Sequence, residues 1–236
     1  MSAPARPWCT RHPRLLAGLT SSALVAFLFL AVAAHRVPFF ACDLTLTRAL
    51  QGVNVPWLDT LWSSVGAMGF IPVVDYIDVA TLLALFFAGR RWESAAAGFA
   101  VVGAAGLHYI VKPLVMRPRP PTDLVHVAHH FPASNSSFPA GHVLNAVAFV
   151  GFLCYLAWTR MPPSWLRTTL VATLVAYIAL MGPARIGAGD HWPSDVLGGY
   201  LLGAVWLVLS VVLYEWRSQR GAQRGGEPQA GVADEH

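Results

Sequence analysis

Charged residues are scarce in this chain: of its 236 residues only 12% are charged, whereas 56% are hydrophobic. A soluble domain carries about 25% charged residues, so an ordinary soluble globular protein is excluded. Lysine is nearly absent, with one residue against fifteen arginines, and no basic stripe runs through a polar domain. The net charge of +4 therefore does not indicate a nucleic-acid-binding protein.

Cysteine is also scarce, and no pair among Cys9, Cys42 and Cys154 has metal-ligand spacing. Three cysteines cannot all pair within one chain, so no disulfide framework is predicted. A histidine-rich loop offers only Asp123 as a carboxylate partner, which favours a solvated loop over a metal site. We therefore predict neither a metal nor another cofactor. The loop histidines are His126, His129 and His130.

The chain instead contains six apolar runs of the length that crosses a bilayer as a helix, roughly 20 residues. They are too long for barrel strands and lack strict alternation. We predict an all-α polytopic membrane protein with one bundle of six transmembrane helices. The runs are Leu15–Ala34, Pro72–Gly89, Trp92–Val111, Ala140–Trp158, Leu166–Pro183 and Val196–Tyr214.

The boundaries of this bundle follow from the segments around the runs. The first run resembles a signal peptide, but it exceeds the roughly 7–15 apolar residues of that class, so we favour a retained helix. The polar segment Phe39–Phe70 is predicted to be external, with short surface helices. The domain then covers residues 15–215, with cytoplasmic tails at 1–14 and 216–236. The second tail is rich in Gly, Gln and Arg and is predicted to be disordered.

Arginines mark one end of every predicted span. With the N-terminus inside, ten basic residues fall on the cytoplasmic side and six outside, as the positive-inside rule requires. Four of the six outer residues lie in the motifs described next, against that rule, and binding an anion is the simplest reason for them. These four are Lys112, Arg117, Arg119 and Arg185.

Three short motifs carry this outer charge. In the first, Pro113 is expected to end the helix at Lys112, and flanking prolines stiffen the segment that carries Arg119. Lysine and arginine suit phosphate contacts, although basic residues at span ends are also ordinary interfacial residues.

In the second motif, Ser137 is the expected N-cap of a helix. The first amides of that helix, from Ala140 and Gly141, would face an anion, and His142 follows them.

In the third motif, Arg185 follows Pro183 near the exit of a span, and His191 and Asp195 are four residues apart at the start of the next. On one helix face the carboxylate would accept from the ring N–H and leave the other nitrogen free to attack. A helix-start aspartate beside a histidine is the plain alternative, but it explains neither Arg185 nor the other motifs.

These residues resemble the type 2 phosphatidic acid phosphatase (PAP2) superfamily. Its pattern is K-x6-RP, then PSGH, then SR-x5-H-x3-D, and the matching residues lie within 112–195. The resemblance implies that His191 is a nucleophile forming a phosphohistidine, that Asp195 orients it, and that His142 protonates the leaving oxygen. It also implies phosphate binding by basic side chains and amides. The phosphate-binding candidates are Lys112, Arg119, Ala140, Gly141 and Arg185.

Two positions depart from the family pattern. Ala140 and Ala184 stand where serines are expected, which removes hydroxyl donors worth roughly 1.5–3 kcal/mol each to a charged acceptor. Water or Ser136 is a candidate substitute. Further headgroup contacts are expected from Arg117, Asp75 and Asp78, although the two aspartates also fit a shallow interfacial position.

The resulting prediction is an integral membrane phosphatase of the plasma or inner membrane, with an extracytoplasmic site. Its expected substrate is a lipid phosphate or pyrophosphate, such as polyprenyl pyrophosphate, phosphatidic acid or phosphatidylglycerol phosphate. A lipid phosphotransferase using the same histidine is one alternative. A lipid-phosphate binding or transport protein with a decayed site is the other. Its expected partners are the bilayer and its lipid substrate, and no sequence feature indicates an oligomeric state.

Overall fold

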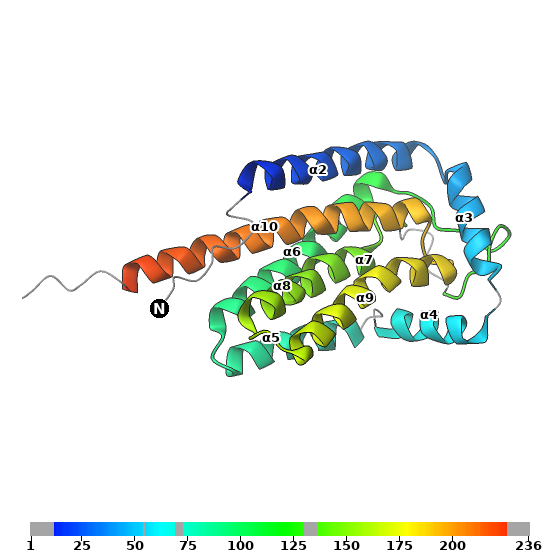
Figure 1. Ribbon diagram of the computed structural model, residues 1–236. Helices are drawn as coiled ribbons and strands as arrows, with labels where there is room; N and C mark the ends of the chain where they lie inside the picture. The colour runs from blue at the N-terminus through cyan, green and yellow to red at the C-terminus, as the bar shows by residue number, and fades with distance from the viewer. Residues whose placement is uncertain (1–11, 54, 69–72, 130–135, 226–236) are drawn as a thin grey trace, which may run out of the picture.

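The protein is all-α over the residues that its computed structural model describes, which are 12–53, 55–68, 73–129 and 136–225 (Figure 1). The predicted fold class is therefore confirmed for these ranges. The helices are α2 (Pro13–Arg36), α3 (Ala41–Gln51), α4 (Pro56–Met68), α5 (Val73–Phe87), α6 (Arg91–Val115), α7 (Gly141–Asn145), the π-helical turn η1 (Ala146–Val150), α8 (Gly151–Arg160), α9 (Trp165–Gly187) and α10 (Pro193–Gly225).

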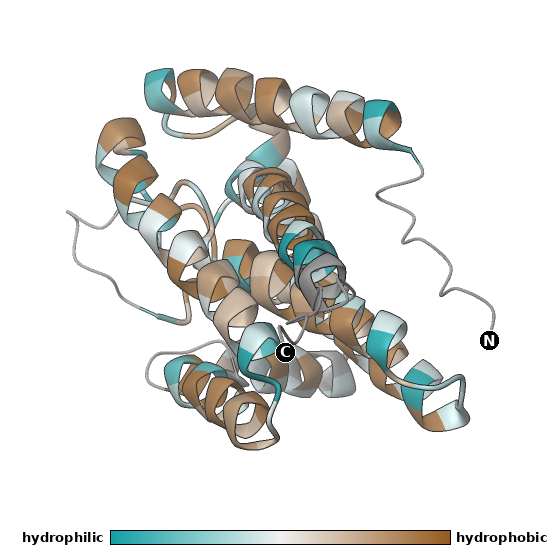
Figure 2. Cartoon of the chain, turned by 90° about the vertical axis from the view of Figure 1, so that its left-hand side faces the viewer, coloured by the Kyte–Doolittle hydropathy of each residue, from teal (hydrophilic) through white to brown (hydrophobic). Residues whose placement is uncertain are grey.

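Five of the six predicted spans are long and apolar enough to cross a membrane: α2, α6, the continuous α7–η1–α8 segment, α9 and α10. The remaining span, α5, has 15 residues and rises about 22 Å, less than a hydrocarbon core of about 30 Å. The membrane character is confirmed, and the count of six full spans holds only approximately. Figure 2 shows apolar residues along the helices, with hydrophilic ones mostly towards their ends.

The bundle is built around α10, which packs against α2, α6 and the α7–η1 segment. Helix α2 lies along α10 on one side of the bundle, and α3 lies at the end opposite the C-terminus of α10 (Figure 1). Helix α4 packs along α9. The predicted external segment thus contributes one helix to the end of the bundle and one to its side.

Two prolines lie inside helices that were predicted to end near them. Helix α6 continues past Pro113 to Val115, and α9 continues past Pro183 to Gly187. Each helix closes later, with the amide of Met116 donating to the carbonyl of Lys112 at the end of α6. Lys112 and Arg185 therefore lie in the last turns of helices rather than in loops. Helix α10 also extends to Gly225, so residues 216–225 are helical and not disordered, while 226–236 lie outside the described residues.

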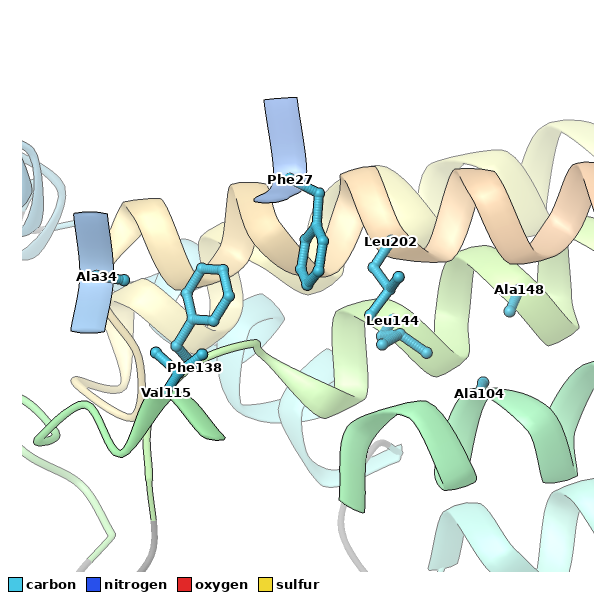
Figure 3. Packing of buried hydrophobic residues seen from close by; sticks show 8 residues of the cluster. All are labelled: Phe27, Ala34, Ala104, Val115, Phe138, Leu144, Ala148 and Leu202. Carbon is cyan, nitrogen blue, oxygen red and sulfur yellow. The ribbon is translucent and has the colours of Figure 1, made fainter. Parts of the chain in front are cut away.

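Phe138 anchors the segment before α7 in the core (Figure 3). Its side chain is fully buried, and its ring stacks on Phe27 of α2 with 5.7 Å between centroids. This segment packs closely against two glycines of α10. A Cβ on Gly198 would meet the Phe138 ring at 2.5 Å, and one on Gly199 would lie 2.7 Å from the carbonyl oxygen of Ala140. Because Gly198 and Gly199 have no side chains, the segment before α7 packs directly against α10.

We expect Gly199→Ala to destabilise the protein and lower its activity. The added methyl collides with the backbone of Ala140, which cannot rotate away, and overpacking of this kind costs about 1–3 kcal/mol. Thermal unfolding in detergent measures the effect. The control is Gly18→Ala on α2, where no atom lies within 4 Å of the new methyl. Equal midpoints for both variants would contradict the tight packing of α10 against Ala140.

Candidate active site

The three motifs meet at one end of the bundle, where α6 and α9 end and α7 and α10 begin (Figure 1). His191 lies in the turn before α10 and is 2% exposed. Burial lowers the pKa of its ring well below the usual value, and the charges of Arg119, His142, Lys112 and Arg185 act in the same direction. All four predicted partners therefore lie within electrostatic range of His191.

This environment disfavours the charged form of the His191 ring, and Lys112, Arg119 and Arg185 lie within electrostatic range of it. A neutral imidazole has a free lone pair, which a nucleophile needs. Lysine and arginine side chains converging on a buried point provide the charge that an oxyanion needs. The arrangement suits attack of a ring nitrogen on the central atom of a bound oxyanion.

We expect the ring of His191 to titrate well below pH 6.5 in the empty site. Its folded pKa is depressed, so lowering the pH through 6.5 protonates the unfolded chain first and reduces stability. Nitrogen-15 NMR of histidine-labelled protein, assigned with His191→Gln, measures the pKa directly. Adding vanadate should raise it, because an anion nearby favours the charged ring. Titration near 6.5 without vanadate would contradict the burial.

The sequence predicted a direct hydrogen bond between Asp195 and His191, but the structure shows none. The nearest ring nitrogen, Nδ1, lies 3.9 Å from Asp195 Oδ2, too far for a hydrogen bond. The hydroxyl of Ser137 lies between them, donating to Asp195 Oδ2 and lying 3.4 Å from Nδ1. The amide of Trp192 donates to the same carboxylate oxygen at 2.8 Å. The contacts between the Asp195 carboxylate and the turn of His191 therefore run through the Ser137 hydroxyl and the Trp192 amide.

Arg117 occupies a different place from the predicted headgroup contact. Its side chain is fully buried, and Nη1 donates to Asp195 Oδ1 and to Ser194 Oγ, both at 2.7 Å. Nη2 donates to Asp43 Oδ2 at 2.8 Å, and Nε donates to the carbonyl of Pro38 at 3.1 Å. This buried guanidinium joins α3 to the carboxylate behind His191, so we assign it to the support of the site.

Asp190 joins two of the predicted phosphate-binding arginines. Its backbone carbonyl accepts from Arg119 Nη1 at 2.6 Å, and its carboxylate accepts from Arg185 Nη1 at 3.1 Å. His129 Nδ1 lies 3.0 Å from the other carboxylate oxygen. Arg185 also donates to the carbonyl of Gly66. Asp190 thus balances part of the positive charge and fixes both guanidinium groups.

The second motif differs in detail from its prediction. Ala140, not Ser137, occupies the N-cap of α7, and no side chain caps this helix. The amide of Ala140 donates to the backbone carbonyl of Asp195 at 3.0 Å, so it is already used. The hydroxyl of Ser136 accepts from the amide of Arg117 at 3.0 Å. Because the Ala140 amide already has an acceptor, Gly141 is the remaining candidate amide. The role of Ser136 at a phosphate stays a prediction.

The two acidic candidates of α5, Asp75 and Asp78, differ in their burial. Asp75 is exposed, whereas Asp78 is 7% exposed and accepts from Asn145 Nδ2 at 3.0 Å. Asn145 lies three residues after His142 in the same helix, so Asp78 contacts the helix that carries His142, whereas Asp75 is exposed. Among the described residues, no group of three or more His, Cys, Asp or Glu side chains has the geometry of a metal site.

Sequence reasoning missed several residues that the structure brings to the site. Asp43 and Ser194 hold Arg117, Ser137 bridges the histidine to its carboxylate, and Asp190 joins the arginines. Asp190 carried a signal, as an acid directly before His191, and Ser137 and Ser194 lie in the second and third motifs, although other roles or none were predicted for them. Asp43 lies in a segment that the sequence predicted only to be external. A further residue of this kind is His108, whose ring packs against Gly141.

Comparisons with known proteins identify the family of this chain. Phosphatidylglycerophosphatase B of Bacillus subtilis (strain 168) is 27% identical over 187 residues, covering 77% of this chain and 88% of that protein. A crystal structure of a transmembrane PAP2-type phosphatidylglycerolphosphate phosphatase from Bacillus subtilis has a TM-score of 0.69 at 22% identity, covering 89% of this chain and 98% of that one. The structure of Aquifex aeolicus LpxE has a TM-score of 0.59 at 27% identity, covering 75% and 98%. The PAP2 superfamily profile matches residues 93–219, which include all three motifs, and the chain belongs to this superfamily of phosphatases.

Proposed function

We propose that the protein hydrolyses a lipid phosphate or pyrophosphate through a phosphohistidine on His191. The observation that carries this proposal is the buried His191 ring, on which the charges of Arg119, Lys112 and Arg185 converge. The named relative with the broadest coverage is a phosphatidylglycerophosphatase, which supports a lipid substrate. A site at the end of a membrane bundle suits a substrate whose tail stays in the bilayer.

In the proposed first step, His191 Nε2 attacks phosphorus, and a P–N bond forms while the P–O bond to the leaving group breaks. His142, protonated at the start, gives its proton to the departing oxygen. In the second step the neutral His142 takes a proton from water, whose oxygen attacks phosphorus. The P–N bond then breaks, and inorganic phosphate leaves.

Charge stabilisation in this scheme rests on side chains. Lys112, Arg119 and Arg185 hold the equatorial oxygens, and the amide of Gly141 adds one backbone donor. A phosphoryl-transfer transition state needs mainly positioning and charge, which fixed cations supply. Ala140 adds neither a hydroxyl nor a free amide, because its amide already donates to Asp195. The arginines held by Asp190 therefore carry more of the binding.

We further propose that both termini are cytoplasmic and that the site faces the extracytoplasmic side. The arginine distribution supports this orientation, with ten basic residues at the inner ends of the predicted spans. In this topology residues 15–215 form the membrane domain between two tails. Reporter fusions after Arg220 and within the loop around His126 distinguish the two orientations.

The direct test is phosphate release from a panel of prenyl diphosphate, phosphatidic acid and phosphatidylglycerol phosphate, with and without EDTA. We expect release from at least one lipid and no effect of EDTA. Acid-labile, base-stable labelling of the enzyme by a ³²P-labelled substrate should accompany turnover and disappear in His191→Ala. Absence of both turnover and labelling with every lipid would overturn the proposal.

The same assay separates the alternatives. A phosphotransferase would move the label to a second lipid rather than to inorganic phosphate, which thin-layer analysis of the products detects. A binding or transport protein would bind vanadate but form no labelled enzyme. The intact set of nucleophile, acid and cations favours hydrolysis over the latter.

A further inference from the structure

His108 has no assigned role, yet it lies in the wall of the candidate site. It is on α6 one turn before Lys112, which places both side chains on the same face of that helix. Its ring packs against the backbone of Gly141 so closely that a Cβ there would collide with Cε1 and Nδ1. The absence of a side chain at Gly141 therefore allows the His108 ring to pack here, as well as allowing an anion to approach the backbone.

The nitrogen-bearing part of the His108 ring packs against Gly141. The ring atoms nearest to the position of a Gly141 Cβ are Cε1 and the two nitrogens. Nδ1 is buried and has no hydrogen-bond partner among the described residues. A buried ring nitrogen without a partner costs free energy, roughly 1–3 kcal/mol, so a group that binds here is expected. Nδ1 of His108 is thus able to form a hydrogen bond with a bound ligand.

The position of His108 indicates which part of a substrate it meets. It lies four residues, about 6 Å, further into the bundle than Lys112, in the direction in which a lipid tail must extend. His108 also lies within electrostatic range of His142, the residue expected to protonate the leaving oxygen. Both observations place His108 on the leaving-group side of the scissile bond, away from the phosphoryl group that His191 attacks.

We propose that His108 contacts the leaving group and selects lipid diphosphates over lipid monophosphates, an inference that rests on the proposed function. In a diphosphate the leaving group is itself a lipid phosphate, whose oxygens accept hydrogen bonds and carry negative charge as the P–O bond breaks. In a monophosphate of the same lipid it is an alcohol, whose single oxygen is the one that His142 protonates, so no further oxygen remains to accept from His108. An imidazole donor next to His142 therefore favours the diphosphate specifically.

The test compares farnesyl diphosphate with farnesyl monophosphate, which share one tail, in detergent micelles. We expect His108→Phe to lower kcat/KM for the diphosphate about tenfold or more, the usual effect of losing a hydrogen bond to a charged group. The monophosphate should lose much less. His108→Asn, whose amide lies near the position of Nδ1, should restore most of the preference, and Tyr109→Phe on the exposed neighbour should leave the ratio unchanged.

The ratio of the two substrates in one preparation does not depend on the folded fraction, so partial misfolding does not hide the result. Equal losses on both substrates in His108→Phe, or an unchanged ratio, would overturn the role of His108. Failure of the proposed function itself would look different, because the wild-type protein would then release phosphate from neither substrate, or His191→Ala would release it as fast as the wild type.

Discussion

Replacing His191 by alanine should abolish phosphate release, with a loss of about 10⁴-fold or more in kcat, as for other enzymes that lose their nucleophile. The ring lies at the point where the charges of Arg119, Lys112 and Arg185 converge, and no other described imidazole has Asp195 behind it. Without the ring there is no acceptor for the phosphoryl group, so labelling by a ³²P-labelled substrate should vanish together with turnover.

His126→Ala is the matched control for this experiment. His126 lies on the exposed loop, and its backbone amide and carbonyl hydrogen-bond to the side chain of Gln51. Losing its side chain should leave turnover within about twofold of the wild type, as expected of an exposed surface position. If His191→Ala kept vanadate binding while losing turnover, the proposed phosphate-binding side chains would still be in place. The lost turnover would then reflect the missing nucleophile. Equal activity in the two alanine variants would exclude His191 as the nucleophile.

Much of this site was predictable because each motif places its residues at the end of an apolar run. Run length and arginine placement put Lys112, His142 and His191 near one end of the bundle, and family resemblance supplied the spacing. The structure places them there. The ends of the helices were predicted less well, because Pro113 and Pro183 were taken as breaks. Long membrane helices tolerate such prolines, since neighbouring helices re-satisfy the freed backbone groups.

The supporting residues were not predictable because their partners are far away in the chain. Asp43 is 74 residues from Arg117, and Ser137 is 58 residues from Asp195. Local patterns report which face of a helix is apolar, but they do not report which distant carboxylate a buried arginine meets. Arg117 was therefore assigned to the headgroup by its neighbours in the motif. The Ala140 amide was misassigned for the same reason, since its acceptor lies on α10.

Replacing Arg117 by methionine should reduce activity about 100-fold or more and lower stability by about 3–5 kcal/mol, because it leaves two buried carboxylates without their cation. Asp195 would then shift towards the protonated form or rotate, and the Ser137 hydroxyl would lose its fixed acceptor. Arg117→Lys should keep part of the stability but lose activity, since an ammonium cannot bridge Asp43, Ser194 and Asp195 with fixed geometry.

A second pair of variants separates stability from positioning. Arg117→Met combined with Asp43→Leu replaces the outer ion pair by apolar groups, a change that is often neutral for stability. Asp195 still lacks its guanidinium, so activity should stay low while the unfolding midpoint recovers in part, because one of the two unpaired carboxylates has been removed. The control is Arg48→Met on the same helix as Asp43. The Arg48 side chain is exposed, and its Nε donates to the carbonyl of Leu124. Recovery of turnover in the double variant would show that Arg117 acts on stability alone, whereas low turnover in a stable protein identifies it as the group that holds Asp195 behind His191.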